Sequence, residues 1–193
     1  GIDPDIEKLP SKYAKDLTGL EAFLLDYISF ANDYVISYKP NISFFEALGL
    51  DGLRLLEKIM EKVSADIPVI IDAKRGDIGN TAKMQARFIY DYFGADATTL
   101  HPYMGADSVV PFFEYKDKFN FVLVLTSNPS HDDFETLLLD NQKPLYESVL
   151  SKCNQWLESY KNVGCVVGAT SNNISKLRKV NRSLLFLLPG VGA

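Results

Sequence analysis

A run of charged residues follows one of the apolar stretches of this sequence. Ile67–Asp72 predicts a buried strand that ends in a carboxylate, Lys74 comes two residues later, and Asp77 follows. On an extended backbone, residues two apart point to the same side, so Asp72 and Lys74 should face the same space. Burying charges is costly unless they are paired, so this run favours a chemical role over a purely structural one.

A second lysine, Lys39, ends the apolar run Tyr34–Lys39. If that run lies beside the next strand, Lys39 could reach Asp72. Lys39, Asp72, Lys74 and Asp77 would then alternate in charge, and each would hold its neighbour in the charged form. Their titrations would be coupled. The alternative is an ordinary ion-pair network with a helix cap, because such networks are common at strand ends.

Apolar runs and helical patterns alternate along the chain. The predicted strands are Tyr34–Lys39, Ile67–Asp72, Ala97–Leu100, Phe121–Thr126, Val163–Gly168 and Leu184–Leu188. The predicted helices are Leu20–Asn32, Gly49–Val63, Thr81–Phe93, Leu145–Tyr160 and Asn173–Val180, the last with Asn173 as its cap. Most of the strands are continuously apolar, as expected for a parallel sheet buried on both faces. Repeated βα units imply right-handed crossovers onto that sheet.

Two α/β architectures fit this alternation, an open doubly wound sheet and a closed barrel. No Gly-x-Gly-x-x-Gly follows an early strand, which weakens a dinucleotide-binding fold. Polar or charged residues end most of the strands, and this favours the (β/α)₈ TIM barrel. Such barrels usually need about 250 residues. We therefore expect one barrel domain over residues 1–193, lacking part of the first strand, whose tail is Gly1–Pro4, and the last βα unit.

Composition restricts the class of protein. The net charge of −5 argues against a nucleic-acid or membrane-surface binder. No apolar run reaches the roughly 18 residues that a membrane span needs. The two cysteines, Cys153 and Cys165, lack metal-ligand spacing and suit buried thiols in a reducing, cytoplasmic setting. Only two histidines occur, so we expect no histidine-based metal site.

Five segments, in order along the chain, resemble the orotidine 5′-phosphate decarboxylases of the bacterial-type subgroup. They are Gly1–Pro4, Ser37–Asn41, Asp72-Ala-Lys-Arg-Gly-Asp-Ile-Gly-Asn-Thr81, Leu125–Pro129 and Pro189–Ala193. The resemblance implies decarboxylation of orotidine 5′-phosphate to uridine 5′-phosphate in de novo pyrimidine biosynthesis, with neither metal nor organic cofactor. It also implies a homodimer.

The resemblance assigns a role to each charged residue. Asp72 would lie beside the substrate carboxylate, where repulsion is relieved as CO₂ leaves. Lys74 would stabilise the negative charge that builds on the pyrimidine carbon and would then deliver the proton, an electrostatic preorganisation. Lys39 would orient Asp72 and touch the ribose. Asp77 would reach into the site of the partner subunit.

Further positions match the family's substrate contacts. Asp3 corresponds to a ribose-contacting aspartate, and Ser127 to a residue that hydrogen-bonds the pyrimidine edge. Pro189 begins the loop that closes over base and phosphate. Asn41, Ile78 and Thr81 match positions near the ribose and the cross-subunit wall. The family continues past Gly-Val-Gly-Ala193 into a glutamine, a Gly-Gly pair and a phosphate-binding arginine, which this sequence does not include.

Other interpretations remain open. Sugar-phosphate lyases of the same superfamily, such as hexulose-phosphate synthase or keto-gulonate-phosphate decarboxylase, use magnesium and carry a glutamate where this chain has Lys39, which cannot ligate Mg²⁺. A catalytically dead nucleotide-binding scaffold would also account for a short chain. His101–Gly105 is expected to shape the barrel mouth or dimer face. The loop Asn128–Lys143 could form a mobile lid or a surface excursion. Asp132, Asp133 and Glu135 in it should be a solvated acidic cluster rather than a metal site.

Overall fold

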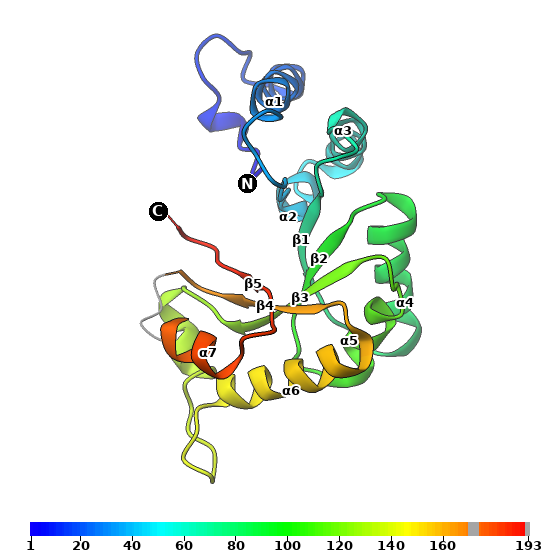
Figure 1. The fold of residues 1–193 in the computed structure, drawn as a ribbon. Coiled ribbons are helices and arrows are strands. Elements are labelled where there is room, and N and C mark those ends of the chain that lie inside the picture. Colours follow the sequence, from blue (N-terminus) through cyan, green and yellow to red (C-terminus); the bar gives the residue numbers. More distant parts are fainter. Residues whose placement is uncertain (170–173, 192–193) are drawn as a thin grey trace. The chain divides into compact units, whose positions relative to one another are not determined.

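The structure, a computed structural model, describes residues 1–169 and 174–191 (Figure 1). It divides into two compact units. Unit 1 comprises Gly1–Ala73 with Arg87–Ala97, and unit 2 comprises Lys74–Ala86 with Thr98–Ala193. In the described part the strands form one five-stranded sheet in chain order: β1 (Ile70–Arg75), β2 (Ala97–Leu100), β3 (Phe119–Leu125), β4 (Val163–Val167) and β5 (Phe186–Leu187). The predicted α/β class is therefore confirmed.

Unit 1 is built mainly from helices. They are η1 (Ile6–Lys8), α1 (Leu17–Ala31), α2 (Ile42–Glu46), α3 (Gly49–Lys62) and the short π-helix η2 (Phe88–Tyr92). Asp16 caps α1, because its Oδ1 accepts a hydrogen bond from the Gly19 amide at 2.8 Å. Leu20 and Ile28 of α1, Phe45 of α2 and Leu56 of α3 are all buried, and α3 packs against both α1 and α2.

One predicted strand of unit 1 is wrong in its bounds. Tyr34 lies in a turn and residues 35–37 are irregular, and only isolated parallel bridges follow, at Tyr38, Pro40 and Asn41. The apolar run is largely on the surface, with Ile36 93% exposed, and Pro40 has no amide hydrogen to donate to a ladder. The next strand, β1, begins three residues later than predicted and extends through Arg75.

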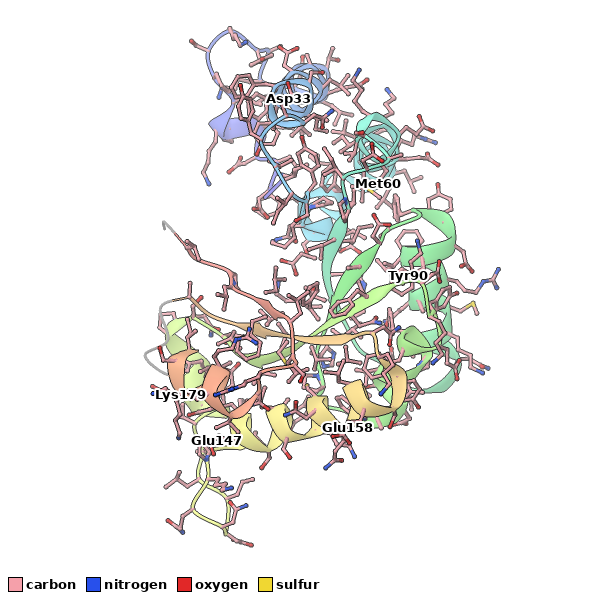
Figure 2. The ribbon with its side chains drawn as sticks, viewed as in Figure 1. Asp33, Met60, Tyr90, Glu147, Glu158 and Lys179 are labelled. Atoms are coloured by element: carbon pink, nitrogen blue, oxygen red, sulfur yellow. The ribbon has the colours of Figure 1, made fainter. Side chains whose placement is uncertain are left out.

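Unit 2 packs helices against strands β3 and β4. Its helices are α4 (Gly79–Arg87, whose last residue belongs to unit 1), α5 (Ala106–Phe113), η3 (Pro129–Asp133), α6 (Leu145–Tyr160) and α7 (Ile174–Val180). Strands β3 and β4 are parallel, with Phe121 opposite Gly164 and Val122 opposite Cys165. Helix α6, with Glu147 near its start and Glu158 near its end, packs on both strands (Figure 2).

The remaining predicted elements differ mainly at their ends. The predicted helix over residues 81–93 is α4 followed directly by η2, and Gly94 after it has φ +67°, as expected for a helix end. The predicted last strand, Leu184–Leu188, is reduced to β5. The predicted cap Asn173 lies outside the described residues. Cys153 and Cys165 are buried thiols, as expected.

Candidate functional site

Three short parallel segments of unit 1 bring their carboxyl ends together. Ile2 bridges Pro40, and Asn41 bridges Asp72 within β1. The Asn41 amide donates to the Ile2 carbonyl at 2.9 Å, and the Asp72 amide donates to the Pro40 carbonyl at 2.9 Å. Because parallel strands end at the same edge, this pairing gathers the residues that follow each segment.

An ion pair joins two of these residues. The Nζ of Lys39 lies 3.2 Å from Oδ2 of Asp72. The Asp72 side chain is only 10% exposed and that of Lys39 only 24%, so the pair is largely withdrawn from water. A buried carboxylate is tolerable beside an opposite charge, which favours its ionised form. This is the contact that the order of the predicted strands suggested, while the wider four-residue array stays a prediction.

Two further predicted residues lie in unit 1. Asp3, the residue after the Ile2 bridge, is exposed. Asn41 caps α2, since its Oδ1 accepts a hydrogen bond from the Ser43 amide at 3.2 Å. Their contacts to a ribose stay predictions.

Lys74, the first residue of unit 2, has an unusual backbone. Its φ is +45°, a left-handed value inside strand β1. Such a conformation costs a non-glycine residue about 1–3 kcal/mol and persists only where the surroundings enforce it. The Lys74 amide donates to Oγ1 of Thr99 at 2.9 Å, and the side chain of Lys74 is exposed. Thr99 itself is buried in β2 and did not feature among the predicted site residues.

The segment after Lys74 leads into helix α4. The His101 amide donates to the Arg75 carbonyl at 2.9 Å. The Oδ1 of Asp77 accepts a hydrogen bond from the Ile78 amide at 2.7 Å, and the Thr81 amide donates to the Ile78 carbonyl at 3.2 Å. Asp77 is half-buried, whereas Ile78 and Thr81 are exposed. Local hydrogen bonds therefore shape the turn that presents all three predicted residues.

The ends of β3 and β4 also meet in unit 2, beside the segment that follows β5. The Gly168 amide donates to the Leu125 carbonyl at 2.8 Å, and the Ala169 amide donates to the Pro189 carbonyl at 2.9 Å. A Cβ on Gly168 would lie only 2.8 Å from Cβ of Ser127, so this position has no room for a side chain. The predicted residues Ser127 and Pro189 thus flank the same short segment. Gly192 and Ala193 of the predicted closing loop lie outside the described residues.

The sequence predicts that Glu135 belongs to a solvated acidic cluster, and the structure shows a different role. Its Oε2 accepts a hydrogen bond from the Thr126 amide at 2.7 Å, and its Oε1 lies 2.8 Å from Oγ1 of Thr126. The side chain therefore ties the loop back to the end of β3, directly before Ser127. Asp132 and Asp133 are exposed, as expected. Nothing in the spacing of Glu135 and Thr126 along the sequence signals this contact.

Residues 1–169 and 174–191 contain neither a membrane-spanning helix nor a cluster of potential metal ligands. No helix among them is both long and apolar enough to cross a membrane. Their His, Cys, Asp and Glu side chains form no group of three or more that could hold a metal ion.

Comparison with known proteins identifies the family of the chain. The model of the "Orotidine 5′-phosphate decarboxylase / HUMPS family" matches residues 12–193. An orotidine 5′-phosphate decarboxylase of Herpetosiphon aurantiacus is 43% identical over 194 residues, covering 100% of this chain and 73% of the relative. The relative from Christiangramia forsetii is 41% identical, with 100% and 72% covered.

Solved structures give the same result. The OMP decarboxylase of Leishmania donovani superposes with a TM-score of 0.87 at 39% identity, over 93% of this chain and 72% of that one. The UMP synthase of the same organism superposes at 0.91 and 38% identity, over 100% of this chain and 42% of that one. These structures are TIM barrels, so the predicted fold is confirmed. The chain belongs to the orotidine 5′-phosphate decarboxylase / HUMPS family and is a carboxy-lyase.

Proposed function

We propose that this chain converts orotidine 5′-phosphate to uridine 5′-phosphate and CO₂, a step of pyrimidine biosynthesis, and that Lys39, Asp72, Lys74 and Asp77 carry the reaction. The observation that supports this most directly is the 3.2 Å ion pair of Lys39 with the buried Asp72, two residues before Lys74 in the same strand. The names of the relatives supply the substrate.

Each charge has a place in the proposed reaction. Lys39 holds Asp72 as a carboxylate against the cost of its burial. The Asp72 carboxylate faces the substrate carboxylate, and their repulsion is relieved when the bond from the ring carbon to that carboxylate breaks and CO₂ departs. The electron pair stays on the ring carbon, where the Lys74 ammonium stabilises it and then donates a proton to it. The neutral Lys74 amine then takes up a proton from solvent, so the cycle consumes one proton and releases CO₂ and uridine 5′-phosphate.

We propose no metal or organic cofactor for this reaction. The magnesium-dependent relatives need a carboxylate at the position of Lys39, and a lysine ammonium at the centre of the site repels a cation. Decarboxylation should therefore persist in excess EDTA. Loss of activity in EDTA, restored by Mg²⁺, would instead favour a sugar-phosphate lyase.

The remaining predicted residues contribute to binding in this proposal. Asp3 and Asn41 contact the ribose, Ser127 contacts the pyrimidine edge, and Pro189 begins the loop over the base and phosphate. Glu135 supports this assignment for Ser127, because it fixes the residue directly before it.

We further propose a homodimer in which Asp77 and the neighbouring Ile78 and Thr81 reach the site of the partner subunit. Exposed large apolar side chains occur at Ile78 and Met84, 55% and 52% exposed, and at Tyr103 after β2, 81% exposed. Contiguous exposed apolar surface is typical of an interface. Sedimentation at micromolar concentration should give twice the chain mass.

Residues 1–193 act as one catalytic domain in this proposal. Two buried thiols suit the reducing cytoplasm, where we expect the protein. Cell fractionation would test the cytoplasmic location.

Lys74→Ala is the first test. It should lower kcat/KM by several orders of magnitude while UMP still binds, because it removes the proton donor and leaves the fold intact. Near-normal turnover by Lys74→Ala would contradict the mechanism. Tight UMP binding without CO₂ release by the unsubstituted protein would favour a scaffold.

Asp77→Ala should be rescued in part by mixing with Lys74→Ala subunits, because one site of each hybrid dimer contains both residues.

A further inference from the structure

We infer that Thr99 is a positioning residue for the reaction, because its hydroxyl holds the Lys74 backbone in a left-handed conformation and thereby aims the Lys74 ammonium. The inference rests on the proposed function of Lys74. Thr99 has no ionisable group and would touch no substrate in this role.

Lys74 has its left-handed backbone in an unusual place, inside a strand. Among the described residues, Lys74, Gln142 and Lys161 are the non-glycine residues with positive φ. Lys161 follows the last residue of α6, and Gln142 lies in the turn between the bridged residues Leu138 and Pro144. Left-handed residues are ordinary at helix ends and in turns. Lys74 lies inside a strand, where this conformation needs a specific cause.

Thr99 supplies that cause. In a regular ladder the amide of a strand residue donates to a carbonyl of the neighbouring strand. The Lys74 amide donates to a side chain, the Oγ1 of Thr99, at 2.9 Å. Thr99 is 1% exposed, so this acceptor is sheltered from water and fixed by the packing around β2.

The residues after Lys74 are held by the same end of β2. The His101 amide donates to the Arg75 carbonyl at 2.9 Å, and a Cβ added to Gly76 would lie 2.7 Å from Nε2 of His101. The backbone therefore follows a fixed path immediately beyond Lys74. With that path fixed, the φ of Lys74 sets the direction of its Cα–Cβ bond and hence the region that its ammonium can reach.

A conformational role predicts a particular kinetic effect. If the Thr99 hydroxyl is lost, Lys74 can relax toward ordinary strand geometry, and its ammonium moves away from the reacting carbon. A displacement of about 1 Å in a catalytic group can cost on the order of 100-fold in rate. Binding of substrate through other residues should change little, so the loss should fall on kcat rather than on KM.

Thr99→Val tests the inference, because valine has nearly the shape of threonine but cannot accept the hydrogen bond. We expect kcat to fall about 10–100-fold, with KM and the inhibition constant of UMP near normal. Thr99→Ser keeps the hydroxyl and should restore most of kcat. The matched control is Thr98→Val, which makes the same change at the adjacent buried threonine of β2 and should keep kcat. Expressing kcat per UMP-binding site prevents partial unfolding from imitating the effect.

A double variant separates this inference from the function on which it rests. If Thr99 acts through Lys74, Thr99→Val should cause no further loss of the residual rate in a Lys74→Ala background. A normal kcat for Thr99→Val, an equal loss for Thr98→Val, or a further loss in the double variant would each overturn the inference. If Lys74→Ala itself kept full activity, the proposed function would fail, whatever the result for Thr99.

Discussion

The ion pair of Lys39 with Asp72 makes a quantitative prediction for unfolding. Two unit charges 3.2 Å apart attract by about 5 kcal/mol at an effective dielectric constant of about 20. Removing one partner of a buried pair usually costs about 3–5 kcal/mol, because the other charge loses the compensation that this partner gave. The Lys39 side chain keeps 24% of its surface exposed, so water can reach the vacated position. We therefore expect Lys39→Met to cost about 3 kcal/mol, the lower end of that range.

Thermal unfolding followed by circular dichroism at pH 7 measures this cost. For a chain of this size about 3 kcal/mol corresponds to a fall in Tm of roughly 6–12 °C. The urea midpoint should fall with an unchanged slope, because the surface exposed on unfolding stays the same. The control is Lys58→Met in the same unit, which breaks a 2.8 Å pair with Glu21 whose lysine side chain is 55% exposed. An exposed pair of this kind should cost less than about 1 kcal/mol.

The double variant Lys39→Met/Asp72→Asn completes the experiment. It removes both charges, so it should be more stable than Lys39→Met alone. The reasoning is refuted if Lys39→Met melts like the Lys58→Met control, or if neutralising Asp72 in addition lowers Tm further. In either case the 3.2 Å contact would not compensate the burial of the carboxylate.

Three further predictions concern unit 2. Glu135→Ala should raise KM about tenfold, more than it lowers kcat, because the Thr126 amide loses a charged acceptor next to Ser127. Steady-state assays with orotidine 5′-phosphate measure this. The control is Asp132→Ala, which removes an exposed carboxylate of the same loop. A hydrogen bond with Cys153 and burial raise the pKa of the Cys165 thiol, so the folded chain retains a proton that the unfolded chain releases above about pH 8.5. Stability should therefore fall as pH rises past that value, by up to about 1.4 kcal/mol per pH unit, and Cys165→Val should flatten the dependence of the urea midpoint on pH. Gly76→Ala should lower Tm, because the new Cβ would lie 2.7 Å from both Nε2 and the carbonyl oxygen of His101. Overpacking of this kind costs about 1–3 kcal/mol. An unchanged Tm would mean that His101 moves aside.

The sequence predicts best where a buried element has a continuous apolar pattern. Val163–Gly168 becomes β4, every residue of which is buried, and Ala97–Leu100 becomes β2 with the predicted bounds. The prediction fails at Tyr34–Lys39, because apolar composition does not reveal exposure. Ile36 and Tyr34 are 93% and 75% exposed, so no packing draws this run into a strand.

The contacts of the predicted site are likewise only partly readable in the sequence. The contact of Lys39 with Asp72 follows from charge and strand order, and both are readable in the sequence. The role of Glu135 depends on a loop that folds back nine residues to Thr126, which no periodicity signals. The role inferred for Thr99 depends on a left-handed φ at Lys74, and sequence reasoning expects that conformation mainly at glycine.

Strand β1 carries Asp72 and Lys74 two residues apart, and the structure secures them in different ways. Asp72 is held through its side chain, by the Lys39 ammonium. Lys74 is held through its backbone amide, by the Thr99 hydroxyl. The difference suits the proposed roles, because Asp72 must remain charged and in place throughout the reaction, whereas Lys74 must give up a proton from its ammonium. The hydrogen bond to its backbone amide keeps Lys74 in position before and after the proton transfer, since this bond does not depend on the charge of the side chain.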